Sequence, residues 1–155
     1  MGIPLHFERR HEEAAARFRK VLETEPTFMP ARHYLGLALD AQGRHAEAIT
    51  ELEAGAPGSG LRVSALTRAY ARSGKEKEAR QVLDELLRRP QYVSPYTVAT
   101  IYDGLGDKAQ ALTWLEKAAD ERAFWLVFAR VDPRLDGVRD DPRFAAVLKR
   151  MKLAP

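Results

Sequence analysis

The sequence predicts an all-α fold in which antiparallel helix pairs stack in a row. Alanine recurs at Ala14, Ala48, Ala79 and Ala111, which lie 34, 31 and 32 residues apart. A large apolar residue follows each alanine four positions later, and a glycine precedes each of the last three by five positions. Self-similarity at this period is typical of repeat proteins, where each helix pair buries its apolar face against its neighbours. Such a stack offers a surface for holding another molecule.

The composition excludes several classes of protein. A hydrophobic content of 45% with 30% charged residues fits an ordered fold. The net charge of +3 is too small to indicate nucleic acid, and no apolar run approaches the length of a membrane span. The chain has no cysteine, which excludes disulfides, a thiolate nucleophile and cysteine-based zinc sites. We therefore expect a cytoplasmic protein with neither a nucleic-acid nor a membrane partner.

Apolar periodicity predicts three helices in the first third of the chain, at about 8–23, 30–42 and 45–54. Pro26 and Pro30 separate the first two, and Pro30 suits the first turn of a new helix. Gly43 separates the second and third, because glycine readily adopts the left-handed conformation that ends a helix. The glycine-rich run 55–60 that follows is a loop by composition.

The same pattern predicts two further pairs, at about 61–73 with 76–89 and 95–105 with 108–121. Gly74 and Gly106 form their internal turns, and Pro90 ends the first of these pairs. Ser94 followed by Pro95 is a strong helix-start signal, because serine caps free backbone N–H groups and proline suits the first turn.

The remaining residues break the period. Two similar phrases, Asp132-Pro-Arg-Leu and Asp141-Pro-Arg-Phe, each predict a helical turn that starts at the proline. The second turn is expected to continue as a helix to about Met151. Acidic residues interrupt the arginines of this segment, so we interpret it as a solvated terminal cap rather than a nucleic-acid site.

One pattern of small and large apolar residues recurs at Leu35, Gly36, Leu39, Gly43, Ala48 and Leu52; at Tyr70, Gly74, Ala79 and Leu83; and at Ala99, Tyr102, Gly106, Ala111, Leu115 and Ala118. At these positions the chain resembles tetratricopeptide repeat (TPR) proteins over roughly 1–121. The resemblance implies a right-handed α-solenoid with repeats at about 1–28, 29–59, 60–91 and 92–121. The segment 122–155 resembles the helical caps of some bacterial TPR regulatory proteins.

The resemblance also implies a binding groove, because the first helix of each TPR pair lines the concave face. Arg68 and Arg72 are one turn apart and are expected to grip a carboxylate or phosphate jointly. Tyr96 is expected to supply a flat apolar contact. We therefore expect a protein or peptide partner in an open groove formed by His33, Leu37, Asp40, Ser64, Arg68, Arg72, Tyr96, Thr100 and Asp103.

Other candidate sites favour structural interpretations, so we predict no catalytic residues, no metal and no cofactor. Gly55 and Gly60 have the spacing of a phosphate-binding loop, but Leu61 and Arg62 follow instead of Lys and Ser or Thr. His11 and His45 share one repeat position and are not part of a ligand cluster. The chain also contains no asparagine, so the carboxylate clamp of chaperone-binding TPR domains has no counterpart here.

Two other functions stay open at this stage. By repeat register, the chain begins inside the first helix of a repeat, which leaves an apolar strip without its usual partner. If the chain is complete, we expect a homodimer through this N-terminal end, with Leu5 and Phe18 at the contact. Alternatively, the chain is a non-catalytic part of a larger bacterial signalling protein or transcriptional regulator.

Overall fold

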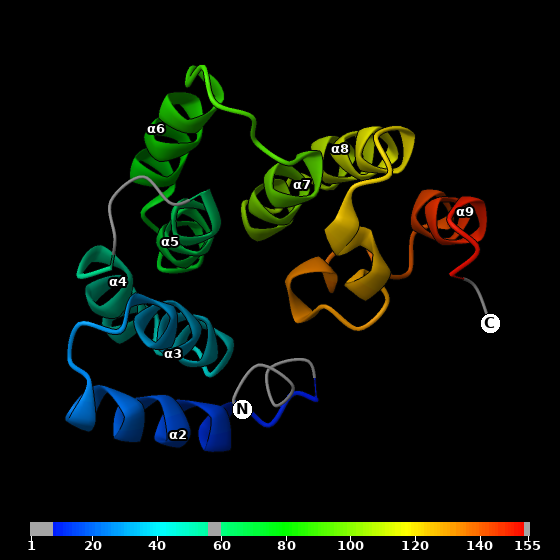
Figure 1. The fold of residues 1–155 in the computed structure, drawn as a ribbon. Helices are drawn as coiled ribbons and strands as arrows, with labels where there is room; N and C mark the ends of the chain where they lie inside the picture. Colours follow the sequence, from blue (N-terminus) through cyan, green and yellow to red (C-terminus); the bar gives the residue numbers. More distant parts are fainter. Residues whose placement is uncertain (1–7, 56–59, 154–155) are drawn as a thin grey trace.

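The computed structural model describes residues 8–55 and 60–153, and all regular structure in these two ranges is helical. The prediction of an all-α fold is therefore confirmed. Predicted and observed helix ends differ by at most three residues. Seven α-helices form an arc (Figure 1): α2 (His11–Thr24), α3 (Met29–Ala41), α4 (His45–Glu53), α5 (Gly60–Arg72), α6 (Glu76–Leu87), α7 (Pro95–Gly104) and α8 (Lys108–Asp120).

Glycines form the turns within three helix pairs, as predicted. Gly43, Gly74 and Gly106 adopt φ values of 77°, 81° and 77°. A Cβ added at any of the three would meet no atom within 4 Å. Glycine is therefore required here by the positive φ and not by a lack of space. By contrast, Ser94 makes no side-chain hydrogen bond to α7, although that helix starts at Pro95 as predicted.

Small residues let the helices approach one another closely. The four repeated alanines are completely buried. Gly36 shows how tight the packing is, since an added Cβ would lie 2.5 Å from Cγ of the buried Leu52. The glycine of the Leu35-Gly36 pair in the repeat pattern is therefore required for steric reasons. None of the helices in the described ranges is long and apolar enough to cross a membrane.

The helices form two layers. α3, α5 and α7 contact one another in sequence along the inner side of the arc, whereas α4, α6 and α8 lie on the outer side (Figure 1). The second helix of each pair packs on the first, and α2 packs on α3. We use the term inner face for the side of α3, α5 and α7 that is turned towards the hollow of the arc.

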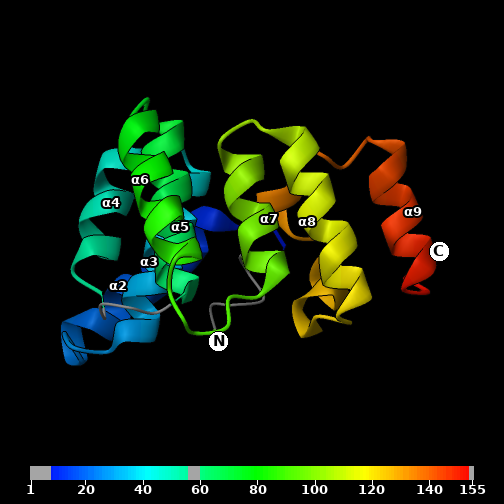
Figure 2. The ribbon, with the colours of Figure 1, turned by 90° about the horizontal axis from the view of Figure 1, so that it is seen from above.

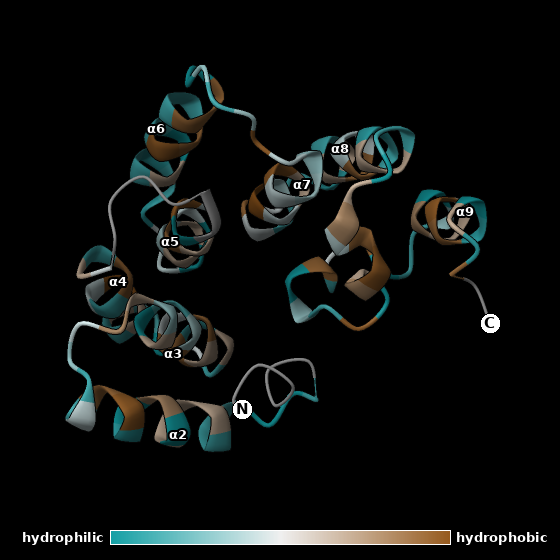
Figure 3. Cartoon of the chain, in the orientation of Figure 1, coloured by the Kyte–Doolittle hydropathy of each residue, from teal (hydrophilic) through white to brown (hydrophobic). Residues whose placement is uncertain are grey.

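The C-terminal residues turn back into this hollow. The two 3₁₀ turns η1 (Phe124–Phe128) and η2 (Pro133–Leu135) lie inside the arc, and α9 (Pro142–Arg150) packs beside α8 (Figures 1 and 2). η1 is predominantly hydrophobic (Figure 3). The completely buried Leu126 and Leu135 share a core cluster with residues of α7, α8 and α9. Both Asp-Pro phrases start a helical turn at the proline, as predicted.

Candidate binding site on the inner face

The nine residues predicted for the groove lie on α3, α5 and α7, but most of them are not open to solvent. As whole residues His33 and Asp103 are half-buried, although the side chain of Asp103 is only 6% exposed, and Arg72 alone among the nine is exposed. The expectation of an open groove is therefore wrong for the six buried ones, whose exposed fractions are 8% or less: Leu37, Asp40, Ser64, Arg68, Tyr96 and Thr100.

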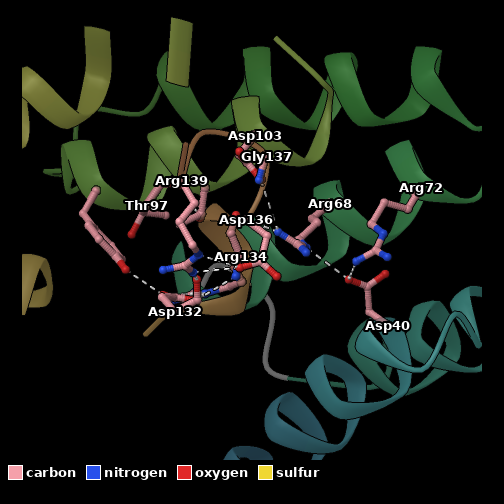
Figure 4. A network of polar contacts seen from close by, with 12 residues as sticks. Asp40, Arg68, Arg72, Thr97, Asp103, Asp132, Arg134, Asp136, Gly137 and Arg139 are labelled. Carbon is pink, nitrogen blue, oxygen red and sulfur yellow. Dashed lines mark hydrogen bonds and ion pairs between the residues drawn. The ribbon is translucent and has the colours of Figure 1, made fainter. Parts of the chain in front are cut away.

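We call residues 124–139 the C-terminal segment; its residues 132–137 contact α5 and α7 on the inner face (Figure 4). Nη1 of Arg68 donates a hydrogen bond of 2.8 Å to the carbonyl oxygen of Arg134. The hydroxyl of Tyr96 donates to Oδ2 of Asp132 at 2.6 Å. Polar groups that were predicted to hold a partner are thus bound to backbone and side chains of the same chain.

Asp132 and Arg134 form an ion pair inside this contact. Nη2 of Arg134 lies 2.6 Å from Oδ2 of Asp132. The side chain of Arg134 is only 10% exposed, and that of Asp132 is 0% exposed. Burial opposes ionisation of Asp132, but the charge and hydrogen bonds of Arg134 outweigh it and lower the pKa of Asp132 to about 2. The prediction of a solvated terminal segment is therefore wrong for this pair.

The C-terminal segment belongs to the folded core, as an energetic comparison indicates. Burying a Val or Leu side chain stabilises a fold by about 1.5–3 kcal/mol, so exposing Leu126, Leu135 and Val138 together costs on the order of 5–9 kcal/mol. A partner of micromolar affinity gains about 8 kcal/mol on binding. A peptide that displaced this segment would lose most of its binding free energy, so we exclude displacement as the way a partner binds.

The two arginines predicted to grip a carboxylate do converge on one, but that carboxylate belongs to α3. Oδ2 of Asp40 lies 3.1 Å from Nε of Arg68 and 3.5 Å from Nη1 of Arg72. Oδ1 of Asp40 contacts Nδ1 of His45 at 2.8 Å. Asp40 is 3% exposed, so it holds α5 and the start of α4 against α3 from inside the fold.

One part of the inner face stays open as a cavity of about 340 Å³. The cavity lies where α3, α5 and α7 end, next to η2. Across it, Arg9 binds both carboxylate oxygens of Asp136 at 2.7 and 2.8 Å, which links the start of the described chain to the residues that follow η2. We call this space the inner cavity; its charged lining residues are Arg9, His11, Arg68, Arg72, Asp103 and Asp136.

Asp103 is the least well paired acid of the inner cavity. Its side chain is 6% exposed, and its Oδ2 lies 4.0 Å from Nη1 of Arg68. The backbone N–H of Gly137 reaches Oδ2 only at 3.4 Å, and the buried Oδ1 has no hydrogen-bond partner. Burial raises the pKa of Asp103 because the neighbouring charges do not fully compensate the lost hydration.

His33 gives this face a pH dependence that can be measured. Burial and then the charge of Arg134 lower the pKa of His33 from 6.5 to about 4. A lowered histidine pKa means that the fold favours the neutral ring, so this stabilisation is present above pH 6.5 and is lost as pH falls towards 4. We expect urea unfolding to show a loss of roughly 2–3 kcal/mol between pH 7 and pH 4.5. His33→Gln should reduce that loss, and an identical pH dependence in both proteins would contradict the assignment.

Sequence reasoning missed the residues that close the inner face from the C-terminal side. Asp132, Arg134, Asp136 and Gly137 all contact residues of other elements. The Asp-Pro-Arg phrase predicted a turn at the right place but gave no sign that the turn enters the hollow. Among the described residues there is also no group of three His, Asp or Glu side chains that could hold a metal ion.

Comparison with known protein families agrees with the arrangement of the helices in stacked pairs. Two family models, each described as a tetratricopeptide repeat, match residues 8–58 and 96–123, together about half of the chain. Searches of curated proteins and of solved structures found no match.

Proposed function

Because this chain belongs to the tetratricopeptide repeat proteins, we propose that it is a protein-binding scaffold whose partner docks at the inner cavity. Repeats of this family serve in general as protein-interaction scaffolds, and they are typically non-catalytic. The observation that carries the proposal is the position of Arg72, which is exposed and lines the part of the inner face that stays open. We propose that Arg72, together with Arg68 and Asp103 on the wall of the same cavity, forms the docking site.

The chemistry of the cavity supports a charged segment of a partner protein as the guest. Arg72 contacts Asp40 at 3.5 Å and is 35% exposed, so its guanidinium retains donors that face solvent. Arg9 is 53% exposed in its pair with Asp136. Charged groups in such positions fix the register and orientation of a partner more than they raise its affinity.

Affinity capture with paired variants tests this proposal. We expect Arg72→Glu to lose the partner that the wild-type chain captures, because the change reverses the charge at the rim of the cavity. Arg88→Glu is the matched control: Arg88 follows α6, is 77% exposed and pairs only loosely with Asp84 at 3.9 Å. Equal capture by all three proteins would contradict the site. Arg72→Gln, with thermal melting of each variant, separates loss of binding from loss of folding.

We further propose that residues 122–155 cap the repeat array, since Leu126 and Leu135 share a core with α7 and α8. The cysteine-free composition suits a cytoplasmic location, which we propose as well. Self-association through the N-terminal end is a weaker candidate. Leu5 lies outside the described residues, and Phe18 is only 8% exposed. A charge at Phe18 would therefore disturb folding, so it is a poor test of association.

A further inference from the structure

We propose that the exposed side of η1 binds an amphipathic helix of a partner protein, and that acidic residues flank the apolar side of that helix. The binding surface is formed by Phe124, Val127 and Val131, and we call these three residues the apolar strip. None of them lines the inner cavity, so this inference goes beyond the proposed docking site and does not depend on it.

The first support is the way in which η1 divides its residues between core and solvent. A 3₁₀ helix has three residues per turn, so every third residue lies on the same side. Leu126 and Ala129 are completely buried and form the side that packs into the core. Phe124 and Val127 form another side, and they are 72% and 50% exposed. Folding requires only the first side to be apolar, so it does not explain the second.

The second support is that exposed apolar residues gather at this place. Val131 is 47% exposed, and its N–H donates to the carbonyl oxygen of Phe128 at 3.0 Å, which keeps it close to η1. Figure 3 shows η1 as predominantly hydrophobic. In the described ranges, the other large apolar residues of comparable exposure lie earlier in the chain: Phe28, Leu87 and Tyr92. Single exposed apolar residues are ordinary, whereas a contiguous group marks an interaction site.

The third support is the charge beside the apolar strip. Arg122 precedes Phe124 by two residues, and Arg130 stands between Val127 and Val131. Both arginines are exposed, and neither makes an ion pair with a described residue. The later arginines with a carboxylate partner are Arg134, Arg139, Arg143 and Arg150. Two unpaired guanidinium groups beside an apolar surface favour a guest that carries carboxylates.

The spacing within the apolar strip favours a helical guest. A 3₁₀ helix rises about 2 Å per residue, so Phe124 and Val127 stand about 6 Å apart along η1. Residues four positions apart in an α-helix are also separated by about 6 Å along its axis. Two apolar side chains at this spacing in a partner helix can therefore contact both residues at once.

A lipid surface matches these residues less well. Recruitment to anionic lipid takes clusters of about four to eight basic residues. The apolar strip has only Arg122 and Arg130 beside it, and the acidic Asp120 and Glu121 come directly before Arg122. The balance of charge therefore favours a protein guest.

A designed peptide tests the inference on the full chain. The probe has about 16 residues, enough to form a helix in water, with two leucines four positions apart and a glutamate one turn beyond each. Alanine and glutamine fill the other positions, and a fluorescein label reports binding by anisotropy. We expect saturable binding with a dissociation constant of tens of micromolar. A second probe with lysine in place of both glutamates should bind about tenfold more weakly. No binding of the first probe, or equal binding of both, would overturn the inference.

Variants of the apolar strip locate the binding. Phe124→Ser should weaken the glutamate probe about tenfold, because it removes the most exposed ring of the strip. Val127→Ser is the second variant, and it decides the matter if Phe124→Ser lowers the melting temperature. Phe28→Ser is the matched control, since Phe28 is 44% exposed and lies outside the strip, and it should bind the probe like wild type. Wild-type affinity in both strip variants would refute the site.

A charge reversal tests the role of the arginines. Arg130→Glu should weaken the glutamate probe and strengthen the lysine probe, whereas Arg88→Glu on exposed α6 should change neither. If Arg130→Glu keeps the wild-type preference, the assigned charge complementarity is wrong. Arg72→Glu should bind the glutamate probe normally, so this inference and the proposed docking site can fail separately.

Two other occupants of the apolar strip are distinguishable from a partner helix. Co-sedimentation with phosphatidylserine vesicles that Phe124→Ser abolishes would identify a lipid surface. A dimer in analytical ultracentrifugation that Phe124→Ser dissociates would identify a second copy of this chain. Either result would replace the inference, and we expect neither.

Discussion

Asp132→Asn is expected to lower the free energy of unfolding by about 3–5 kcal/mol, the usual cost of removing one partner from a buried ion pair. Arg134 would keep its charge in a site where it is 8% exposed, and the neutral side-chain amide of the new asparagine would not balance that charge. Asparagine has nearly the same shape as aspartate and caps a helix equally well. The loss should therefore report the charge rather than the packing or the cap. Urea unfolding followed by circular dichroism would measure it.

The chain supplies a matched control in its second Asp-Pro-Arg phrase. Asp141 caps α9 through the N–H of Arg143 at 2.8 Å, just as Asp132 caps η2 through the N–H of Arg134 at 2.9 Å. The side chain of Arg143, however, is bound to Glu116 at the surface rather than to Asp141. Asp141→Asn should therefore change stability by less than about 1 kcal/mol. Similar losses in both variants would mean that the buried ion pair is not the source of the effect.

Acid titration gives the same prediction a second readout. The pKa of Asp132 is lowered to about 2, so its contribution to stability is present above the unfolded value of 3.8. That contribution is lost as pH falls from about 4 to 2. Wild type should therefore lose stability in this window, and Asp132→Asn should lose less of it. The His33 effect lies at higher pH, between 6.5 and 4, so the two can be separated.

The sequence predicts the helices and their stacking because those features depend on local residues. A glycine at positive φ, an alanine at a close contact and a proline in a first turn each act within one or two turns of the chain. The recurrence of Gly43, Gly74 and Gly106 is therefore enough to place three turns. The inner helices were also identified correctly, since the resemblance assigns them by their position in each repeat.

The state of the inner face could not be predicted, because it depends on contacts between distant residues. Asp132 and Asp141 stand in nearly identical local sequences, yet one is completely buried and the other lies near the surface. What separates them is the hollow of the arc, which exists only after the repeats have stacked. The spacing of Arg68 and Arg72 likewise predicted a carboxylate as their partner. Only the fold identifies this carboxylate as that of Asp40, which lies 28 positions before Arg68 in the sequence.

Phe144→Ala is the second variant for which we expect a loss of about 3–5 kcal/mol, the range for truncating a buried phenylalanine. Phe144 is 2% exposed and shares a core cluster with residues of α7, α8 and η2. α9 has nine residues, and isolated helices shorter than about 12–15 residues are marginal in water. The helix therefore depends on the packing of Phe144 and Val147 for its stability. Removing the ring should both lower the unfolding midpoint in urea and speed amide hydrogen exchange along α9.

The neighbouring residue provides the control. Arg143 is 44% exposed and pairs with Glu116 at 2.9 Å, so Arg143→Ala should cost about 1 kcal/mol or less. The pattern of exchange in Phe144→Ala then decides how far the C-terminal segment is coupled to the repeats. If α9 alone exchanges faster, the helix is a separate unit attached to α8. If the amides of η2 and α7 exchange faster as well, the segment that fills the hollow is held there partly by α9. We expect the second result, because one core cluster joins Phe144 to Leu135 of η2 and to Tyr96 of α7.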